Sequence, residues 1–343
     1  MAEITIRGAG IFGLSIAWAC CQRGARVQVI DPAGPAAGSS GGIVGALAPH
    51  VPENWNPKKA FQLSSLLMAE DFWHSVQETG GQDPGYARTG RLQPIADDAA
   101  LTLARERASG AAGLWHDHAQ WTVCRAGTQD WEPQSPSGWL IHDTLSARIH
   151  PRQACAALVA ALAARGVRVT ADGPAQGRTL WATGAAGLMA LGAGHHRSVG
   201  TGIKGQAALL QFDAGPQPQL FTKGLHIVPH RDGTVAIGST TEREFDDGRA
   251  TDAQLDPLID MARQAVPALA GAPVIERWSG VRPRSRSRAP MLGPWPGRPG
   301  HFVANGGFKI GFGMAPKIAE VMANLLLEDK DTIPPGFDVG ASF

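Results

Sequence analysis

The stretch Gly8-Ala9-Gly10-Ile11-Phe12-Gly13 stands near the N-terminus of this 343-residue chain. It follows the apolar run 4–6, which is typical of a short buried strand, and it leads into the apolar helical run 14–21. A second strand is expected over residues 27–30, and it ends at Asp31, about twenty residues beyond the glycines. Strand, glycine turn, helix, strand and acidic residue in this order predict a dinucleotide-binding unit.

Each glycine of this turn has its own task in such a unit. Gly8 permits the tight turn, Gly10 lets the backbone approach a pyrophosphate, and Gly13 lets the helix pack closely on the strand. The start of the helix offers free N–H groups and the positive end of a dipole to phosphate groups. We therefore expect Ile11 and Phe12 to contact the ligand as well.

The segment that follows separates FAD from NAD, which the glycine turn alone does not. Asp31 and the adjacent Pro32 are expected at a ribose, which both ligands contain. Residues 38–50 are small and glycine-rich where an ordinary NAD domain would begin its next helix. Their backbone can lie flat against a large ligand, although a flexible surface loop is the alternative for such a composition. The contacts expected here are Ser39, Ser40, Val44, Gly45 and Ala46.

At this point the sequence resembles the D-amino acid oxidase and glycine oxidase family of flavoproteins, from residue 4 to about residue 327. Three blocks near the C-terminus carry the resemblance most specifically. They are Trp-Ser-Gly-Val-Arg-Pro at 278–283, Pro-Met-Leu-Gly at 290–293, and Asn-Gly-Gly-Phe-Lys-Ile-Gly-Phe-Gly-Met-Ala-Pro at 305–316. The strands expected over 226–230 and 234–240 match the substrate-domain hairpin of that family.

The resemblance implies an α/β fold. Its FAD domain would be a two-dinucleotide-binding, Rossmann-like domain of the glutathione reductase type, with an inserted antiparallel β-sheet domain for the substrate. We expect the FAD domain to be discontinuous, over residues 1–80, 140–205 and 284–343. The substrate-binding domain is expected over residues 81–139 and 206–283.

The resemblance also implies a noncovalent FAD. In relatives the C-terminal glycine-rich turn receives the pyrimidine end of the flavin, where a helix start would stabilise negative charge on the reduced ring. Relatives with a covalent flavin attach it to a cysteine in the C-terminal half, and no cysteine follows Cys155 here. The further positions expected at the cofactor are Ala175, Gly184, Gly307, Phe308, Lys309, Ile310, Gly311, Phe312 and Gly313.

Three residues are implied at the substrate: Arg282, His226 and Lys309. Arg282 stands where the family has the arginine that holds the substrate carboxylate, a task that suits a planar guanidinium with two parallel donors. A surface or interdomain salt bridge is the alternative. His226 replaces a common tyrosine and would bring pH sensitivity near neutrality if it reaches the substrate, unless it points to solvent. Lys309 replaces the arginine of glycine oxidases.

A basic pocket is a further expectation. Arg282, Arg284, Arg286 and Arg288 alternate with other residues, so on an extended segment they would share one face. The ordinary interpretation is a solvated edge beyond Arg282, and the sharper one is an entry path for a substrate with more than one acidic group. Together with Lys309, this predicts tighter binding of dicarboxylates than of monocarboxylates.

The function that the resemblance implies is an FAD-dependent amino acid or amine oxidase. The enzyme would oxidise the C–N bond of glycine, sarcosine or a small D-amino acid by hydride transfer to flavin N5. The imine would hydrolyse, and O₂ would reoxidise the flavin with release of H₂O₂. The alternatives are a dehydrogenase of the same fold that passes electrons to a quinone or carrier, a 2-hydroxy acid oxidase, or a maturation enzyme of thiamine biosynthesis or tRNA modification.

Composition limits the remaining classes. A net charge of +1 and the absence of a long basic helix weigh against a nucleic-acid partner. No apolar run is long enough for a membrane span, and no signal peptide is recognisable, so a cytoplasmic location is expected. The spacings of His116-Asp117-His118 and His195-His196 do not favour a metal site, so none is expected. The oligomeric state stays open.

Overall fold

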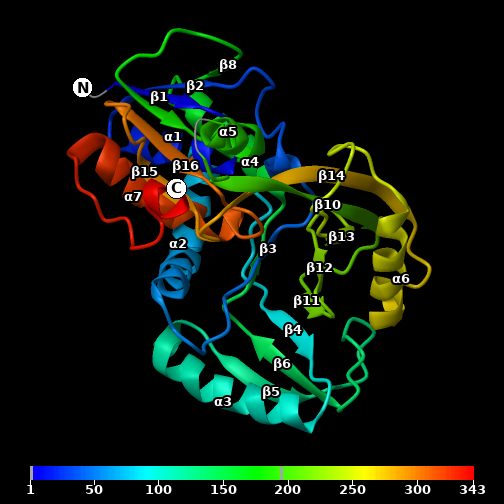
Figure 1. Cartoon of the computed structure of the whole chain (residues 1–343). Coiled ribbons are helices and arrows are strands. Elements are labelled where there is room, and N and C mark those ends of the chain that lie inside the picture. Colours follow the sequence, from blue (N-terminus) through cyan, green and yellow to red (C-terminus); the bar gives the residue numbers. More distant parts are fainter. Residues whose placement is uncertain (1–2, 194–195) are drawn as a thin grey trace.

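Two sheets organise the chain in the computed structural model, which describes residues 3–193 and 196–343 (Figure 1). The smaller sheet has the order β15-β16-β9-β1-β2-β8, and all its neighbours are parallel except β15 and β16. Its strands are β1 (Glu3–Arg7), β2 (Arg26–Ile30), β8 (Val169–Thr170), β9 (Arg178–Trp181), β15 (Met291–Pro294) and β16 (His301–Asn305).

The N-terminal unit has the predicted order of elements. Strand β1 is followed by helix α1 (Ile11–Gln22) and then by β2, which pairs with β1 in parallel. On its other edge β1 pairs with β9, also in parallel. The carboxyl ends of these central strands therefore meet at one edge of the sheet, where dinucleotide ligands bind in such folds.

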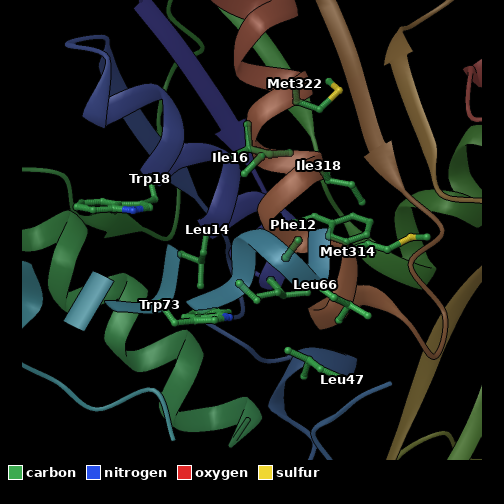
Figure 2. Packing of buried hydrophobic residues seen from close by; sticks show 14 of the residues in the cluster. Phe12, Leu14, Ile16, Trp18, Leu47, Leu66, Trp73, Met314, Ile318 and Met322 are labelled. Atoms are coloured by element: carbon green, nitrogen blue, oxygen red, sulfur yellow. The ribbon is translucent and has the colours of Figure 1, made fainter. Parts of the chain in front are cut away.

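Four helices share one apolar core with this sheet. They are α1, α2 (Pro57–Gly80), α4 (Pro151–Ala164) and α7 (Gly311–Glu328), and the cluster extends to buried residues of α3 (Asp98–Trp115). Figure 2 shows Leu14 and Trp18 of α1, Trp73 of α2 and Met314 of α7 in this cluster, and all four side chains are fully buried. Because α1 packs against α7 and α7 against α2, the starts of α1 and α7 are held in fixed places.

The larger sheet has the order β14-β10-β13-β12-β11-β4-β6-β5, and only β11 and β4 are parallel neighbours. Helix α6 (Asp256–Ala265) packs on it through a second apolar core, and α3 (Asp98–Trp115) packs against β5. The strands are β4 (Arg91–Pro94), β5 (Trp121–Arg125), β6 (Trp139–Asp143), β10 (Gly200–Gln211), β11 (Gln219–Thr222), β12 (Leu225–Pro229), β13 (Thr234–Gly238) and β14 (Val274–Ser285). The predicted hairpin is confirmed as β12 and β13.

Short elements complete the chain. Helix α5 (Gly184–Gly192) packs on β10 and β14, and β3 (Ala46–Leu47) pairs with β7 (Ala147–Arg148). The predicted α/β class is confirmed. Three of the predicted domain boundaries, 139/140, 205/206 and 283/284, cut the strands β6, β10 and β14, which lie wholly in the larger sheet. The division into two domains stays a prediction.

Candidate active site

A cavity of about 1990 Å³ is lined by residues from both sheets. The glycine turn, the start of α1, the 37–46 segment, β14 and the turn before α7 all contribute to its wall. His226, Arg282 and Lys309 line it, as do most of the positions expected at the cofactor. The latter are Gly8, Gly10, Ile11, Phe12, Asp31, Pro32, Ser39, Ser40, Val44, Gly45, Ala46, Gly184, Gly307, Phe308, Gly311, Phe312 and Gly313.

Three of the expected cofactor positions do not line the cavity. Gly13 is a packing residue, because a Cβ atom there would lie 1.9 Å from the carbonyl oxygen of Gly8. Ile310 is the N-cap of α7 and is not part of the wall. Ala175 is exposed on the segment before β9, so the structure does not bring it to the cavity.

The glycine turn is shaped by close approaches that only glycine allows. Gly8 has φ +108°, and a Cβ atom there would lie 2.3 Å from the carbonyl oxygen of Ala182. At Gly10 the nearest atom to a Cβ would be Ser40 Oγ at 3.0 Å, so the protein itself leaves room at this position. A side chain at Gly8 would clash with the protein backbone, whereas a side chain at Gly10 would extend into the cavity.

Asp31 has a task that its sequence position did not reveal. Its Oδ2 accepts a hydrogen bond from the backbone N–H of Ala9 at 2.8 Å, and its Oδ1 accepts one from Ala33 N–H at 3.0 Å. The carboxylate thus braces the glycine turn while lining the cavity. Because each carboxylate oxygen can accept more than one hydrogen bond, Asp31 can also bind a ribose hydroxyl.

In the described chain four α-helices begin at the cavity: α4, where the His150 side chain accepts from the N–H of Gln153, and three whose N-cap residues make no side-chain capping hydrogen bond. At α1, Ser40 Oγ accepts from the N–H of Ile11 at 3.0 Å. The N-caps of these three are Gly10 for α1, Thr183 for α5 and Ile310 for α7, and no first turn contains an acidic residue. Helix starts normally attract Ser, Asp or Glu side chains, which satisfy the free N–H groups and the dipole. Three such positive ends at one cavity fit an elongated anion, and FAD, with its pyrophosphate and its electron-accepting ring, has that form.

Arg282 on β14 is buried, with 7% of its surface exposed. Its Nη2 donates to Ser239 Oγ at 2.8 Å and to the carbonyl oxygen of Thr240 at 3.1 Å. Its Nη1 is also buried, yet it makes no hydrogen bond with any described residue. Burial lowers the pKa of Arg282 to about 10, and the negative charge of Glu242 acts in the opposite direction. A buried cation with a free donor calls for an anionic partner.

Gly205 on β10 makes this placement possible. A Cβ atom at Gly205 would lie 1.3 Å from Arg282 Nη2, so any other residue would displace the guanidinium. Sequence reasoning missed Gly205, Ser239 and Thr240. The signal for the first was present, because a glycine inside a strand often marks a close approach.

Lys309 belongs to a group of cations around the ring of Phe308. Its Nζ lies 5.8 Å from the ring centroid, and the Cζ atoms of Arg282 and Arg284 lie 5.9 Å and 5.5 Å from it. Burial, and then the charge of Arg282, lower the pKa of Lys309. Within the described chain, none of the three forms a salt bridge. The cavity is therefore basic at this end.

The expected row of four arginines is only partly correct. Strand β14 ends at Ser285, so Arg286 and Arg288 lie beyond the extended segment. Arg286 donates instead to the backbone oxygen of Phe343, and Arg288 has a left-handed φ of 62°. Neither residue lines the cavity. These arginines therefore do not form a continuous basic path to the cavity.

His226 lines the cavity and does not point to bulk solvent. Its Nδ1 is buried without a hydrogen-bond partner in the described chain, and its ring lies 4.6 Å from that of Phe221. Burial lowers the pKa of His226 to about 3, and the charges of Arg91 and Lys309 act in the same direction. The expected titration near neutrality is therefore wrong, because the imidazole stays neutral there.

We expect His226 to make the protein acid-sensitive. Unfolded His226 binds a proton below its ordinary pKa of 6.5, whereas folded His226 does so only near 3. The unfolded state binds more protons between these values, so stability falls as the pH falls from about 6.5, by up to about 1.4 kcal/mol per pH unit for one histidine. Urea unfolding of His226→Gln and of the parent at pH 7 and pH 5 checks this. An equal loss of stability in both proteins would contradict it.

Among the described residues, His226 is the one histidine that lines the cavity. No cysteine of the described chain lines it, and the buried Cys155 only approaches its wall, with Sγ 3.9 Å from the carbonyl oxygen of Ser40. Burial raises the pKa of the Cys155 thiol to about 12, which keeps it unreactive. His116 and His118 form a short helical turn after α3, and His195 lies outside the described residues.

Comparison with known proteins agrees with this geometry. The model of the DAO family, FAD dependent oxidoreductase, matches residues 3–325. A glycine oxidase of Pseudomonas aeruginosa is 33% identical over 134 residues, which are 39% of this chain and 37% of that protein. A Rhizobium etli protein named as a thiamine biosynthesis oxidoreductase, ThiO, is 28% identical over 96% of this chain and 97% of its own. The crystal structure of glycine oxidase from Geobacillus kaustophilus has the same fold, with a TM-score of 0.84, 20% identity and 99% of each chain covered.

The helices test the expectation that no segment spans a membrane. Across residues 3–193 and 196–343, no helix is both long enough and apolar enough to cross a membrane. The cytoplasmic location stays a prediction.

Proposed function

Because the chain belongs to the DAO family of FAD-dependent oxidoreductases, we propose that it oxidises the C–N bond of a small amine that carries a carboxylate group. The observation that carries this proposal is Nη1 of Arg282, a buried donor that has no hydrogen-bond partner in the described chain and belongs to a residue lining the cavity. A carboxylate that reaches it would gain a charge-assisted hydrogen bond and would neutralise a buried cation. Glycine oxidase, the name of several relatives, is an activity on such a substrate.

The residues of this chain supply binding and electrostatics. Arg282 would hold the carboxylate and so fix the α-carbon in one position, which is a large part of catalysis when no strong base is needed. FAD, when bound, supplies the acceptor for the hydride. Arg282 and Lys309 also place positive charge near the substrate amine, which favours the uncharged amine over the ammonium form. His226, neutral at physiological pH, adds no charge of its own.

The substrate and the electron acceptor are tested together. Glycine, sarcosine and small D-amino acids are mixed in turn with the holoenzyme without oxygen, and bleaching of the flavin absorbance identifies the substrate. Oxygen is then admitted. Formation of H₂O₂ supports an oxidase, whereas slow reoxidation that a quinone accelerates supports a dehydrogenase. Bleaching by 2-hydroxy acids and by none of the amines would overturn the proposal.

We predict that the purified protein is yellow and that its FAD is noncovalent. No cysteine of the described chain reaches the cavity wall, and the contacts expected along the cofactor are backbone N–H groups and the Asp31 carboxylate. Acid precipitation should therefore release intact FAD into the supernatant, which chromatography against an FAD standard identifies. Flavin that stays with the precipitated polypeptide would contradict this.

We also predict that Lys309 gives the site a preference for two acidic groups. Malonate should bind more tightly than acetate, and the advantage should shrink at higher ionic strength, because solvent reaches part of the Lys309 side chain although its surroundings partly desolvate the ammonium group. Lys309→Met should erase this preference in flavin-absorbance titrations. Arg284→Met is the matched control: its Cζ lies at a similar distance from the Phe308 ring, but Arg284 does not line the cavity. An unchanged preference in Lys309→Met would remove Lys309 from substrate recognition.

A further inference from the structure

Behind Arg282 lies a buried polar network with Glu242 at its centre. Glu242 is 7% exposed, and Lys204 and Gln206 of β10 are 4% and 0% exposed. Lys204 Nζ lies 3.3 Å from Glu242 Oε2, and Gln206 Nε2 donates to Glu242 Oε1 at 3.1 Å. The backbones of Lys204 and Glu242 also exchange two hydrogen bonds of 3.0 Å. The Glu242 carboxylate is therefore held in one position.

Thr240 links this network to Arg282. Its N–H donates to the Gln206 carbonyl oxygen at 3.1 Å, and its Oγ1 accepts from Gln206 N–H at 2.7 Å. The same hydroxyl donates its proton to Glu242 Oε1. Its carbonyl oxygen in turn accepts from Arg282 Nη2. The place of that carbonyl oxygen is thus set by Glu242 and Gln206.

The network and the guanidinium lie on opposite faces of the sheet. Arg282 pairs with Ile203, and Gly205, which leaves space for the guanidinium, lies two residues further along the same face. Lys204 and Gln206 alternate with these residues and so face the other side. The short segment 239–242 passes from one side to the other, and this is how a carboxylate on one face can hold an arginine on the other.

The chemistry of the network indicates that it orients the Arg282 guanidinium more than it stabilises the fold. A buried ion pair contributes little to stability compared with apolar residues of the same size, but it fixes geometry. The hydrogen bonds with Ser239 and Thr240 are made by one nitrogen of Arg282, Nη2, and they leave Nη1 without a partner in the described chain. The charge of Glu242 also opposes the effect of burial on Arg282 and helps to keep it cationic.

We propose that Glu242 is a positioning residue for substrate binding, which acts through Thr240 to hold Arg282 with its Nη1 toward the substrate carboxylate. This rests on the proposed function, in which Arg282 binds that carboxylate. Glu242 itself does not line the cavity. Its removal should therefore weaken the binding of anions selectively and leave the cavity otherwise intact.

The test compares two isosteric variants in the holoenzyme. Glu242→Gln removes the charge but keeps an oxygen that can accept from Gln206. Asp252→Asn is the matched control, because Asp252 contacts Lys204 Nζ at 3.2 Å and Gln206 Nε2 at 2.8 Å but makes no hydrogen bond with Thr240. The probes are propionate and its uncharged analogue propionamide, titrated by the change in flavin absorbance. We expect the Kd of propionate to rise about tenfold in Glu242→Gln, with propionamide unchanged, and to change less than about twofold in Asp252→Asn.

A third variant keeps the proposal testable if Glu242→Gln does not fold. Thr240→Val keeps the backbone carbonyl but loses the hydroxyl that contacts Glu242, so it should show the same selective loss of propionate binding. Equal weakening of both probes, or an equal effect of Asp252→Asn, would make Glu242 a structural residue and overturn the proposal. A different result would contradict the proposed function. If propionate binds Arg282→Ala as tightly as the parent, Arg282 does not hold the carboxylate, and both proposals are wrong.

Discussion

Arg282→Ala is expected to raise the KM for the amine substrate and to lower kcat/KM by about 10- to 100-fold, the loss that follows from removing a charge-assisted hydrogen bond together with its positive charge. The flavin content should stay near that of the parent, because the hydrogen bonds that Arg282 makes within the described chain are to Ser239 and Thr240. Steady-state kinetics and the ratio of flavin to protein absorbance measure both quantities.

Arg282→Lys separates charge from geometry. An ammonium keeps the positive charge but cannot bind Ser239, Thr240 and a carboxylate through one planar group, so only part of the lost efficiency should return. If the alanine and lysine variants both oxidise the substrate like the parent, Arg282 is structural. The class of substrate would then have to be reconsidered.

Gly10→Val is expected to abolish flavin binding while the protein stays folded. A branched side chain at the start of α1 would occupy the part of the cavity where the backbone must meet a pyrophosphate. Within the protein, a Cβ atom at this position approaches only the side chain of Ser40, at 3.0 Å. The variant should therefore be colourless, with a circular dichroism spectrum like that of parent protein stripped of flavin.

Gly13→Ala is the contrasting variant. Its Cβ atom would lie 1.9 Å from the carbonyl oxygen of Gly8, so the helix would have to move away from the strand and the fold itself should suffer. Thermal unfolding distinguishes the two cases. A Gly10→Val protein with the flavin content of the parent would show that the pyrophosphate does not lie at this turn.

The sequence predicts well whatever depends on neighbours along the chain. The glycine turn, α1 and the hairpin of β12 and β13 follow from local patterns of apolar and turn residues. Arg282 could be recognised because it stands within a specific block, residues 278–283. In each case the signal lies within about a dozen residues, a span over which strand and helix periods are readable.

Properties that depend on residues far apart in the chain were not predictable. The neutral state of His226 depends on its burial and on the charges of Arg91 and Lys309, which come from other elements. The support of Arg282 comes from the 239–242 segment and β10. The end of β14 at Ser285, which separates the four arginines, depends on where pairing with β10 stops.

The starts of α1, α5 and α7, whose N-cap side chains make no capping hydrogen bond, affect the stability of the polypeptide before it binds its cofactor. The positive ends of α1, α5 and α7 face one space and have no acidic residue in their first turns. Apart from the Asp31 carboxylate beside the start of α1, they therefore lack, without a ligand, the charge that helix ends usually attract. Flavin then acts as a folding partner as well as a reagent: at a thousand times its Kd, a ligand adds about 4 kcal/mol to the stability of the native state. The amount of active protein in a cell would accordingly follow the supply of FAD.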